Sequence, residues 1–189
     1  MAVAAMHAGL IVREARAADM EAVQGIYAFH VRTGLATFEE IPPTVEVLAE
    51  RRAAVVAAGM PYLIAELGGV VAGYSYATSY RPRPAYRFTV EDSVYVADGL
   101  YGRGIGAALL RALISRCEAG PWRQMVAVIG NSGNTASIAL HTRAGFRLAG
   151  TLGAVGFKLG RWVDSVLMQR PLGLGDSMPP PSDVCGARG

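Results

Sequence analysis

Residues 91–106 read EDSVYVADGLYGRGIG, and this stretch indicates the fold more strongly than any other part of the sequence. A run rich in β-branched residues ends in four glycines, and a helical pattern begins directly after them. At such a junction backbone N–H groups can approach a ligand closely, and the positive end of the helix dipole favours an anion. The stretch therefore predicts a phosphate-binding turn, although the same glycines also suit a tight turn without a ligand.

Two familiar phosphate loops can be tested on their spacing. A Walker A loop needs a Gly-Lys pair, and no such pair occurs in the chain. A dinucleotide fingerprint that begins at Gly102 has Ala107 as its third small residue, and one that begins at Gly104 has Leu109 in place of glycine. The alanine variant is tolerated, but the fingerprint normally opens a βαβ unit, whereas this stretch lies in mid-chain. Dinucleotide binding therefore stays a rival hypothesis.

The composition is typical of a globular protein. The 189 residues suit one domain, with 52% hydrophobic and 17% charged residues. No stretch reaches the roughly 18 apolar residues of a membrane span, and the N-terminal segment lacks the basic region of a secretory signal. We therefore expect a cytoplasmic protein with no membrane partner. The net charge of +3 is scattered along the chain, which argues against a nucleic-acid partner.

The cysteines and histidines predict neither a disulfide nor a metal site. Cys117 falls on the apolar stripe of a predicted helix, and Cys185 lies in a segment rich in proline and glycine, so both are expected to be free thiols. His7 and His30 have no cysteine or carboxylate partner at ligand spacing, so no metal is expected.

Hydrophobic periodicity and turn residues predict the element order β-α-α-β-β-β-α-β-α-β-β. Helices are expected after a cap at Asp19, after Thr44, after the glycine cluster, and at residues 134–143. This mixed pattern predicts an α/β protein whose sheet has parallel and antiparallel parts covered by helices. The domain is expected at residues 10–170, followed by a disordered tail at 171–189. Strands are predicted at residues 10–14, 62–67, 70–80, 88–96, 124–129, 146–152 and 162–169.

Two motifs carry a resemblance to a known family. YGRGIGAALL fits Gly104 and Gly106 to the pyrophosphate motif R/Q-x-x-G-x-G/A, with Tyr101 at its first polar position. NSGNTASIALHTRAGF, at residues 131–146, matches the ending N-x-x-[SA]-x-x-x-[YH]-x-x-x-G-F. Together with TVEDSVYV before them, they make residues 10–170 resemble the GCN5-related N-acetyltransferases (GNAT). IYAFHVRTGLATFEE, RPRPAYRFTVEDSVYV and GTLGAVGFKLGRWVDSVLMQ look like the phosphinothricin and methionine sulfoximine acetyltransferase branch.

The resemblance implies a GNAT fold, with a mixed, mostly antiparallel sheet of seven strands and four helices. It implies acetyl transfer from acetyl-CoA to the amine of a small amino-acid-like acceptor, such as phosphinothricin, methionine sulfoximine, methionine sulfone or a related L-amino acid. The transfer is expected by direct attack in a ternary complex, in a homodimer. The alternative is a binding module for CoA or a dinucleotide without catalysis.

The resemblance also assigns the cofactor contacts. Backbone N–H groups of residues 102–107 would hold the pyrophosphate, with added charge from Arg103 unless that side chain is only solvated. The backbone of residues 94–96 would pair with the pantetheine arm like an added strand, and one amide there would hold the thioester oxygen. Asn134 can cap its helix and also bond to the cofactor. The predicted cofactor-binding residues are Val94, Tyr95, Val96, Gly102, Arg103, Gly104, Ile105, Gly106, Ala107 and Asn134.

Glu91 and His141 are the predicted catalytic residues. Strand alternation places Glu91 opposite Val90 and Asp92, and partial burial there would raise its pKa to suit a general base. A glutamate in water on an edge strand is the alternative. The resemblance implies that Glu91 acts through water and that Asp92 is structural. His141 stands where most of the superfamily has a tyrosine that protonates the departing thiolate, so it is expected to be an acid or to contact the CoA sulfur; a packed or surface histidine is the alternative.

Five residues are predicted to bind the acceptor. Thr37 and Phe38 match the substrate loop of the branch, and Tyr86 is an additional contact. Arg81 and Arg83 suit a carboxylate together with a phosphinate, sulfone or sulfoximine oxygen, although both also read as solvated loop charges.

Two late positions differ from the phosphinothricin-resistance enzymes. Phe157 and Val163 stand where those enzymes carry tyrosine and histidine. This difference favours a methionine derivative or a broader amino-acid acceptor over phosphinothricin.

Overall fold

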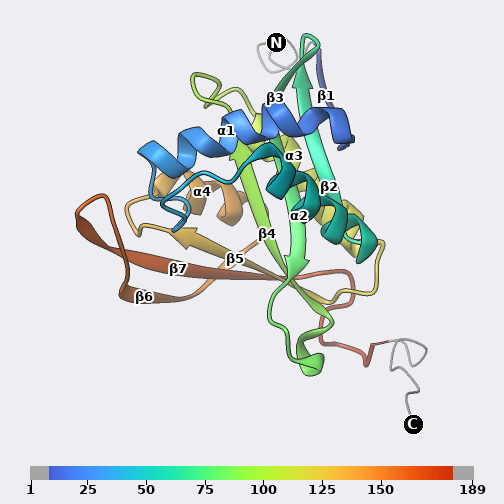
Figure 1. The fold of residues 1–189 in the computed structure, drawn as a ribbon. Helices are drawn as coiled ribbons and strands as arrows, with labels where there is room; N and C mark the ends of the chain where they lie inside the picture. The colour runs from blue at the N-terminus through green and yellow to red at the C-terminus, as the bar shows by residue number, and fades with distance from the viewer. Residues whose placement is uncertain (1–8, 181–189) are drawn as a thin grey trace, which may run out of the picture.

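The computed structural model describes residues 9–180 and confirms the predicted order of elements. These residues contain seven strands in one sheet, in the order β1-β2-β3-β4-β5-β7-β6, and four α-helices. Within that part of the chain no helix is long and apolar enough to cross a membrane. The elements are β1 (Leu10–Glu14), α1 (Met20–Thr33), α2 (Val45–Ala57), β2 (Tyr62–Leu67), β3 (Val70–Ser79), β4 (Thr89–Val96), α3 (Ile105–Glu118), β5 (Gln124–Gly130), α4 (Thr135–Arg143), β6 (Arg147–Lys158) and β7 (Arg161–Pro171), as drawn in Figure 1.

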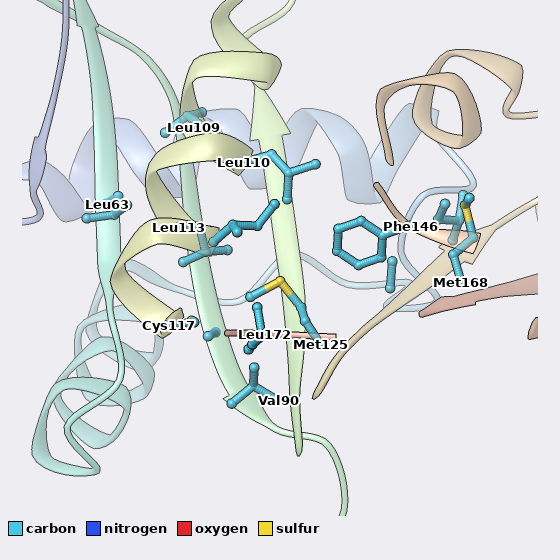
Figure 2. Packing of buried hydrophobic residues seen from close by; sticks show 14 of the residues in the cluster. Leu63, Val90, Leu109, Leu110, Leu113, Cys117, Met125, Phe146, Met168 and Leu172 are labelled. Atoms are coloured by element: carbon cyan, nitrogen blue, oxygen red, sulfur yellow. The ribbon is translucent and has the colours of Figure 1, made fainter. Parts of the chain in front are cut away.

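The sheet is mixed, as predicted. Strands β4 and β5 pair in parallel, and every other neighbouring pair is antiparallel. Two cores form because side chains alternate between the faces of each strand. Ile64 and Tyr74 pack with α1 and α2, whereas Leu63 packs with α3 on the other side. Figure 2 shows the second core, in which leucines of α3 project toward side chains of β2, β4 and β5; it contains Leu63, Val90, Leu109, Leu110, Leu113 and Met125.

Two of the three predicted helix caps are confirmed. The Thr44 side chain accepts a hydrogen bond from the backbone of Val47, and Asn134 caps α4 in the same way. The cap at Asp19 is wrong. Its carboxylate instead accepts two bonds of 2.8 Å from the guanidinium of Arg13, and a backbone bond from Arg16, because a charged fork on β1 outcompetes the neutral N–H groups of the helix.

The last two strands are longer than predicted. Residues 153–158, GAVGFK, have two glycines and no clear alternation, yet they complete β6 because β7 supplies a full pairing partner. The hairpin turns at Leu159 and Gly160, both with positive φ. Strand β7 then runs to Pro171, and Leu172 is fully buried, so the predicted tail begins too early. Residues 181–189, including Cys185, lie outside the described residues, as does His7.

Candidate active site

The site is a fork between the two parallel strands at the centre of the sheet. β4 and β5 pair over only four residues each, and the last pair is Asp92 with Ala127. Beyond that pair β4 continues along β3, while β5 continues along β7 to Gly130, so the strands diverge (Figure 1). A cleft of about 1000 Å³ opens in the fork. The backbone edge of residues 94–96 faces it, and among residues 9–180 no strand pairs with that edge.

Helix α3 begins at the rim of this cleft. Gly102 and Gly104 have φ of 75° and 76°, a conformation that a residue with a Cβ rarely adopts, and they turn the chain into the helix. The first N–H groups of a helix have no partner within it, so the start of α3 offers donors and a positive dipole end to the cleft. All predicted cofactor residues except Arg103 line this one cleft: Val94, Tyr95, Val96, Gly102, Gly104, Ile105, Gly106, Ala107 and Asn134.

Two arginines and a histidine that the sequence analysis did not select as site residues also line the cleft. Arg143 lies at the end of α4 and Arg161 at the start of β7, whereas Arg103 is exposed. His30 reaches over from α1, and its Nε2 donates to the carbonyl oxygen of Val96 at 2.9 Å. Arg143 and His30 lie within motifs that carried the family resemblance, and these motifs are the signal in the sequence that pointed to them.

Glu91 lies on the central strand, between Thr78 of β3 and Val126 of β5. It is half-buried, while Val90 and Asp92 are buried on the opposite face as predicted. The alternative of a solvated glutamate on an edge strand is therefore wrong. Burial raises the pKa of Glu91, the charge of Asp92 raises it further, and the charge of Arg81 partly opposes both. A carboxyl group tuned in this way suits a general base.

His141 is buried and turned toward the sheet. Its Nε2 is hydrogen-bonded to Oδ2 of Asp92 at 3.0 Å, and its Nδ1 donates to the carbonyl oxygen of Ser137 at 2.8 Å. The ring of Phe146 packs edge-on at 5.1 Å. Because both nitrogens already have acceptors, His141 would have to exchange a partner before it could protonate a thiolate. That role stays a prediction.

The predicted acceptor residues lie in two groups. In the loop after α1, buried Thr37 bonds to the hydroxyl of Tyr27 at 2.9 Å, and its carbonyl oxygen accepts a bond of 2.7 Å from Nζ of Lys158. Phe38, in the same loop, is 42% exposed and packs against Gly156 of β6. The long contacts from β6 thus fix the position of this loop.

The second group lies in the loop between β3 and β4. Arg81 and Arg83 are exposed, and the Arg81 guanidinium lies 5.0 Å from the ring centre of Tyr80. Tyr86 packs edge-on against the same ring at 5.8 Å. This loop leads directly into β4, which explains why the charge of Arg81 acts on Glu91.

Comparison with known proteins assigns the family. Residues 12–167 match the model of the acetyltransferase (GNAT) domain. The chain belongs to the GNAT acetyltransferase family.

Several proteins are similar to this GNAT acetyltransferase over most of its length. A phosphinothricin N-acetyltransferase of Alcaligenes faecalis is 58% identical over 89% of this chain and 86% of its own. An L-methionine sulfoximine/L-methionine sulfone acetyltransferase of Pseudomonas paraeruginosa is 43% identical over 84% of this chain and 92% of its own. The crystal structure of a phosphinothricin acetyltransferase from Sinorhizobium meliloti, in complex with AcCoA, aligns with a TM-score of 0.88 at 46% identity, covering 91% and 93% of the two chains. The family resemblance and the GNAT fold are confirmed.

Phe157 and Val163, the two positions that differ from the phosphinothricin-resistance enzymes, differ in their exposure to solvent. Phe157 on β6 is 58% exposed, and its ring packs against Trp162 at 5.4 Å. Val163 on β7 is buried. Of the two side chains, therefore, only that of Phe157 is open to a ligand or a partner.

Metal ligands are also sparse in the GNAT domain. Residues 9–180 contain no group of three or more His, Cys, Asp or Glu side chains arranged to hold a metal ion. The expectation of a metal-free enzyme stays a prediction.

Proposed function

We propose that this GNAT acetyltransferase transfers the acetyl group of acetyl-CoA to the amino group of a small amino-acid-like acceptor. The observation that carries the proposal is the cleft in the fork of β4 and β5, which faces the open N-terminus of α3. The structures of two similar proteins, from Sinorhizobium meliloti and Salmonella typhimurium, contain acetyl-CoA. The names of the similar enzymes support phosphinothricin, methionine sulfoximine, methionine sulfone or a related L-amino acid as the acceptor.

The cleft contains the groups that a CoA thioester requires. The N–H groups at the start of α3 suit the pyrophosphate, and Arg143 and Arg161 can add positive charge in the same cleft. The edge of residues 94–96 suits the pantetheine arm, which would add to β4 like a further strand. An N–H group of this edge would stabilise the negative charge that develops on the thioester oxygen.

The proposed reaction is a direct attack. Glu91 accepts a proton from the acceptor ammonium through a water molecule, and the free amine then attacks the thioester carbon. The C–S bond then breaks, the attacking nitrogen loses its second proton to become an amide, and the departing CoA thiolate takes up that proton. Cys117 does not serve as a nucleophile, because it is fully buried and burial raises the pKa of its thiol to about 12.

The acceptor would enter from the side of the loop between β3 and β4. Arg81 and Arg83 place positive charge at the start of the strand that carries Glu91, which suits the carboxylate and the side-chain oxygens of such an acceptor. The phosphinothricin-resistance enzymes carry a tyrosine at the position of Phe157. Because phenylalanine lacks the tyrosine hydroxyl group, this position favours a methionine derivative over phosphinothricin as the acceptor.

A panel assay tests the proposal. Release of CoA thiol is measured with methionine sulfone, methionine sulfoximine, phosphinothricin and ordinary L-amino acids, and we expect the sulfone or sulfoximine to give the highest kcat/KM. Thermal shift with acetyl-CoA and with NAD runs in parallel, because only a true ligand stabilises the fold by mass action. Stabilisation by acetyl-CoA with no turnover across the panel would indicate a binding module. A covalently acetylated protein after mixing with acetyl-CoA alone would contradict direct attack.

We also propose that the enzyme is a homodimer joined through the hairpin of β6 and β7. This hairpin projects from the body of the molecule (Figure 1) and has large apolar side chains in contact with solvent. Several large apolar side chains exposed on one hairpin are typical of a protein interface. The exposed side chains are Leu148, Leu152, Val155, Phe157, Leu159 and Trp162.

A further inference from the structure

The hydrogen bond between Asp92 and His141 spans the base of the fork. Asp92 is the last residue of β4 that pairs with β5, and His141 belongs to α4, which follows β5. The bond therefore ties one arm of the fork to the helix beside the other arm. A small cavity of about 60 Å³ touches both residues together with Val94 and Gly130, where the two strands separate.

The geometry around the ring decides the protonation state of His141. Both near partners, the carboxylate of Asp92 and the carbonyl oxygen of Ser137, are acceptors only. A neutral imidazole has one N–H group, whereas the imidazolium has two. The hydroxyl of Ser137 lies 3.5 Å from Nδ1, too far for a strong alternative donor. With Asp92 ionised, only the charged form of His141 satisfies both bonds.

The proton on His141 also supplies the counter-charge for the carboxylate of Asp92. Its side chain is 1% exposed, and among the described residues Oδ2 bonds to His141 while the buried Oδ1 has no partner. Loss of the proton from His141 would leave a buried carboxylate without a counter-charge, which is strongly unfavourable. Although burial alone would lower the pKa of His141, the hydrogen bond and charge of Asp92 outweigh burial and raise it, with help from the Ser137 carbonyl.

Asp92 is the charge that acts on His141, although α3 and α4 also carry Arg111, Glu118 and Arg143. β5 carries no ionisable side chain. On α3, burial and then the charge of Asp92 raise the pKa of Cys117, which keeps this thiol neutral. From β7, Arg170 reaches the carbonyl oxygen of Ala144, but its own ion pair is with Glu118. The titration of His141 is thus coupled to Asp92.

We propose that Asp92 and His141 form a charged clamp that sets the spacing of the fork, with Asp92 as a positioning residue for acetyl-CoA binding. The inference rests on the proposed function, since acetyl-CoA must contact both the β4 edge and the start of α3. When the clamp is charged, the β4 edge and α4 are held together at the base of the cleft. When His141 loses its proton, the fork loses this tie, and acetyl-CoA binds more weakly.

The experiment compares the wild-type enzyme with Asp92→Asn, which retains the shape and an acceptor oxygen but removes the charge. Asp176→Asn is the matched control, because Asp176 is exposed and lies beside the start of β5, at the other end of that strand. Calorimetry measures the Kd of acetyl-CoA from pH 6 to 9 without an acceptor. Nitrogen-15 NMR of the imidazole follows His141 in the free wild-type protein.

We expect NMR to show protons on both nitrogens of His141 at pH 7. The Kd of the wild-type enzyme and of Asp176→Asn should rise about tenfold as the pH passes the pKa of His141. Asp92→Asn should have the weaker Kd already at pH 7 and a smaller dependence on pH. A neutral His141 at pH 7, or a wild-type Kd that does not follow the NMR titration, would overturn the clamp even if Asp92→Asn failed to fold.

The other outcomes separate this inference from the proposed function. If Asp92→Asn binds acetyl-CoA as the wild type does, the clamp is wrong and the acetyltransferase proposal stands. If the wild-type enzyme itself binds no acetyl-CoA, both fail. If His141 instead donates directly to the thiolate, His141→Asn lowers kcat with Kd unchanged, and this result also contradicts the clamp.

Discussion

At the scale of single residues, β4 places two carboxylates side by side in the chain but on opposite faces of the sheet. Glu91 faces the side of α1 and α2, where it is half-buried, whereas Asp92 is buried toward α4 and bonded to His141. Alternation along one strand thus separates a half-buried carboxyl group from one held in a buried hydrogen bond to His141. The two predictions at this scale concern Glu91 and the arginines near it.

Removal of the base should slow the reaction without affecting cofactor binding. We expect Glu91→Gln to lower kcat/KM by about 10²- to 10⁴-fold, the usual contribution of a general base, with the Kd of acetyl-CoA unchanged. In the wild type the activity should rise with pH through the raised pKa of Glu91, because the carboxylate is the active form. Thiol release at a series of pH values measures both effects. Glu21→Gln, on the exposed side of α1, is the control; equal activity of the two variants would exclude Glu91 as the base.

Arg81 and Arg83 should differ in their effect on the pH dependence of kcat/KM. Arg81 lowers the pKa of Glu91, so Arg81→Gln should move the acid limb of the kcat/KM profile to higher pH and raise the KM of the acceptor severalfold. Arg83→Gln should raise the acceptor KM without moving that limb. The pH profiles of the two variants provide the comparison, and a wild-type KM in both would remove the arginines from the acceptor site.

At the scale of elements, the acceptor loop is positioned by strands from the far end of the chain. Lys158 of β6 bonds to Thr37 across 121 residues of sequence, and Gly130 of β5 lies directly against the backbone of Leu35. These contacts join the loop after α1 to β5 and to the hairpin. The position of the acceptor loop therefore depends on the last strands of the sheet.

A methyl group at Gly130 should disturb this loop. A Cβ there would lie 2.1 Å from the carbonyl oxygen of Leu35, and a backbone atom cannot rotate out of the way. We expect Gly130→Ala to lower the free energy of unfolding by about 1–3 kcal/mol, as overpacking does, and to raise the acceptor KM. Urea unfolding and steady-state kinetics measure these effects. Gly153→Ala is the control, because a Cβ at Gly153 meets no atom within 4 Å; equal stability of the two variants would contradict the close contact.

At the scale of the whole molecule, the hairpin of β6 and β7 exposes large apolar side chains that a monomer would leave in contact with water. Leu152 is 49% and Trp162 67% exposed, although a monomer gains nothing from apolar side chains in water. The proposed dimer would bury them. The prediction at this scale is therefore a change of oligomeric state.

A charge on the hairpin should separate the subunits. We expect Leu152→Glu to convert the dimer into a monomer in light scattering after size exclusion, because a buried carboxylate without a partner is unfavourable. Val70→Glu, at an exposed apolar residue at the start of β3, should leave the dimer intact. A wild-type enzyme that is a monomer at micromolar concentration would refute the proposed interface.

The sequence by itself determined the features that depend on near neighbours in the chain. The glycines at 102 and 104, the cap at Thr44 and the alternation of Glu91 with Asp92 follow from local backbone conformation and strand period, and all were predicted. Local pattern failed where distant elements decide. The end of β6 was missed because its pairing with β7, not its composition, makes it a strand.

Only the tertiary structure decided which side chains meet. Asp92 and His141 are 49 residues apart in the sequence. Taken alone, Asp92 is predicted to be a structural aspartate, and His141 is a single histidine on a short helix. Periodicity fixes the face of an element that each residue occupies, but not which other element covers that face. The sheet places β4 beside β5, and the chain brings α4 back across their ends. The burial of Glu91, the gathering of the predicted cofactor residues along one cleft, and the Asp92–His141 hydrogen bond at the base of the fork follow from this arrangement.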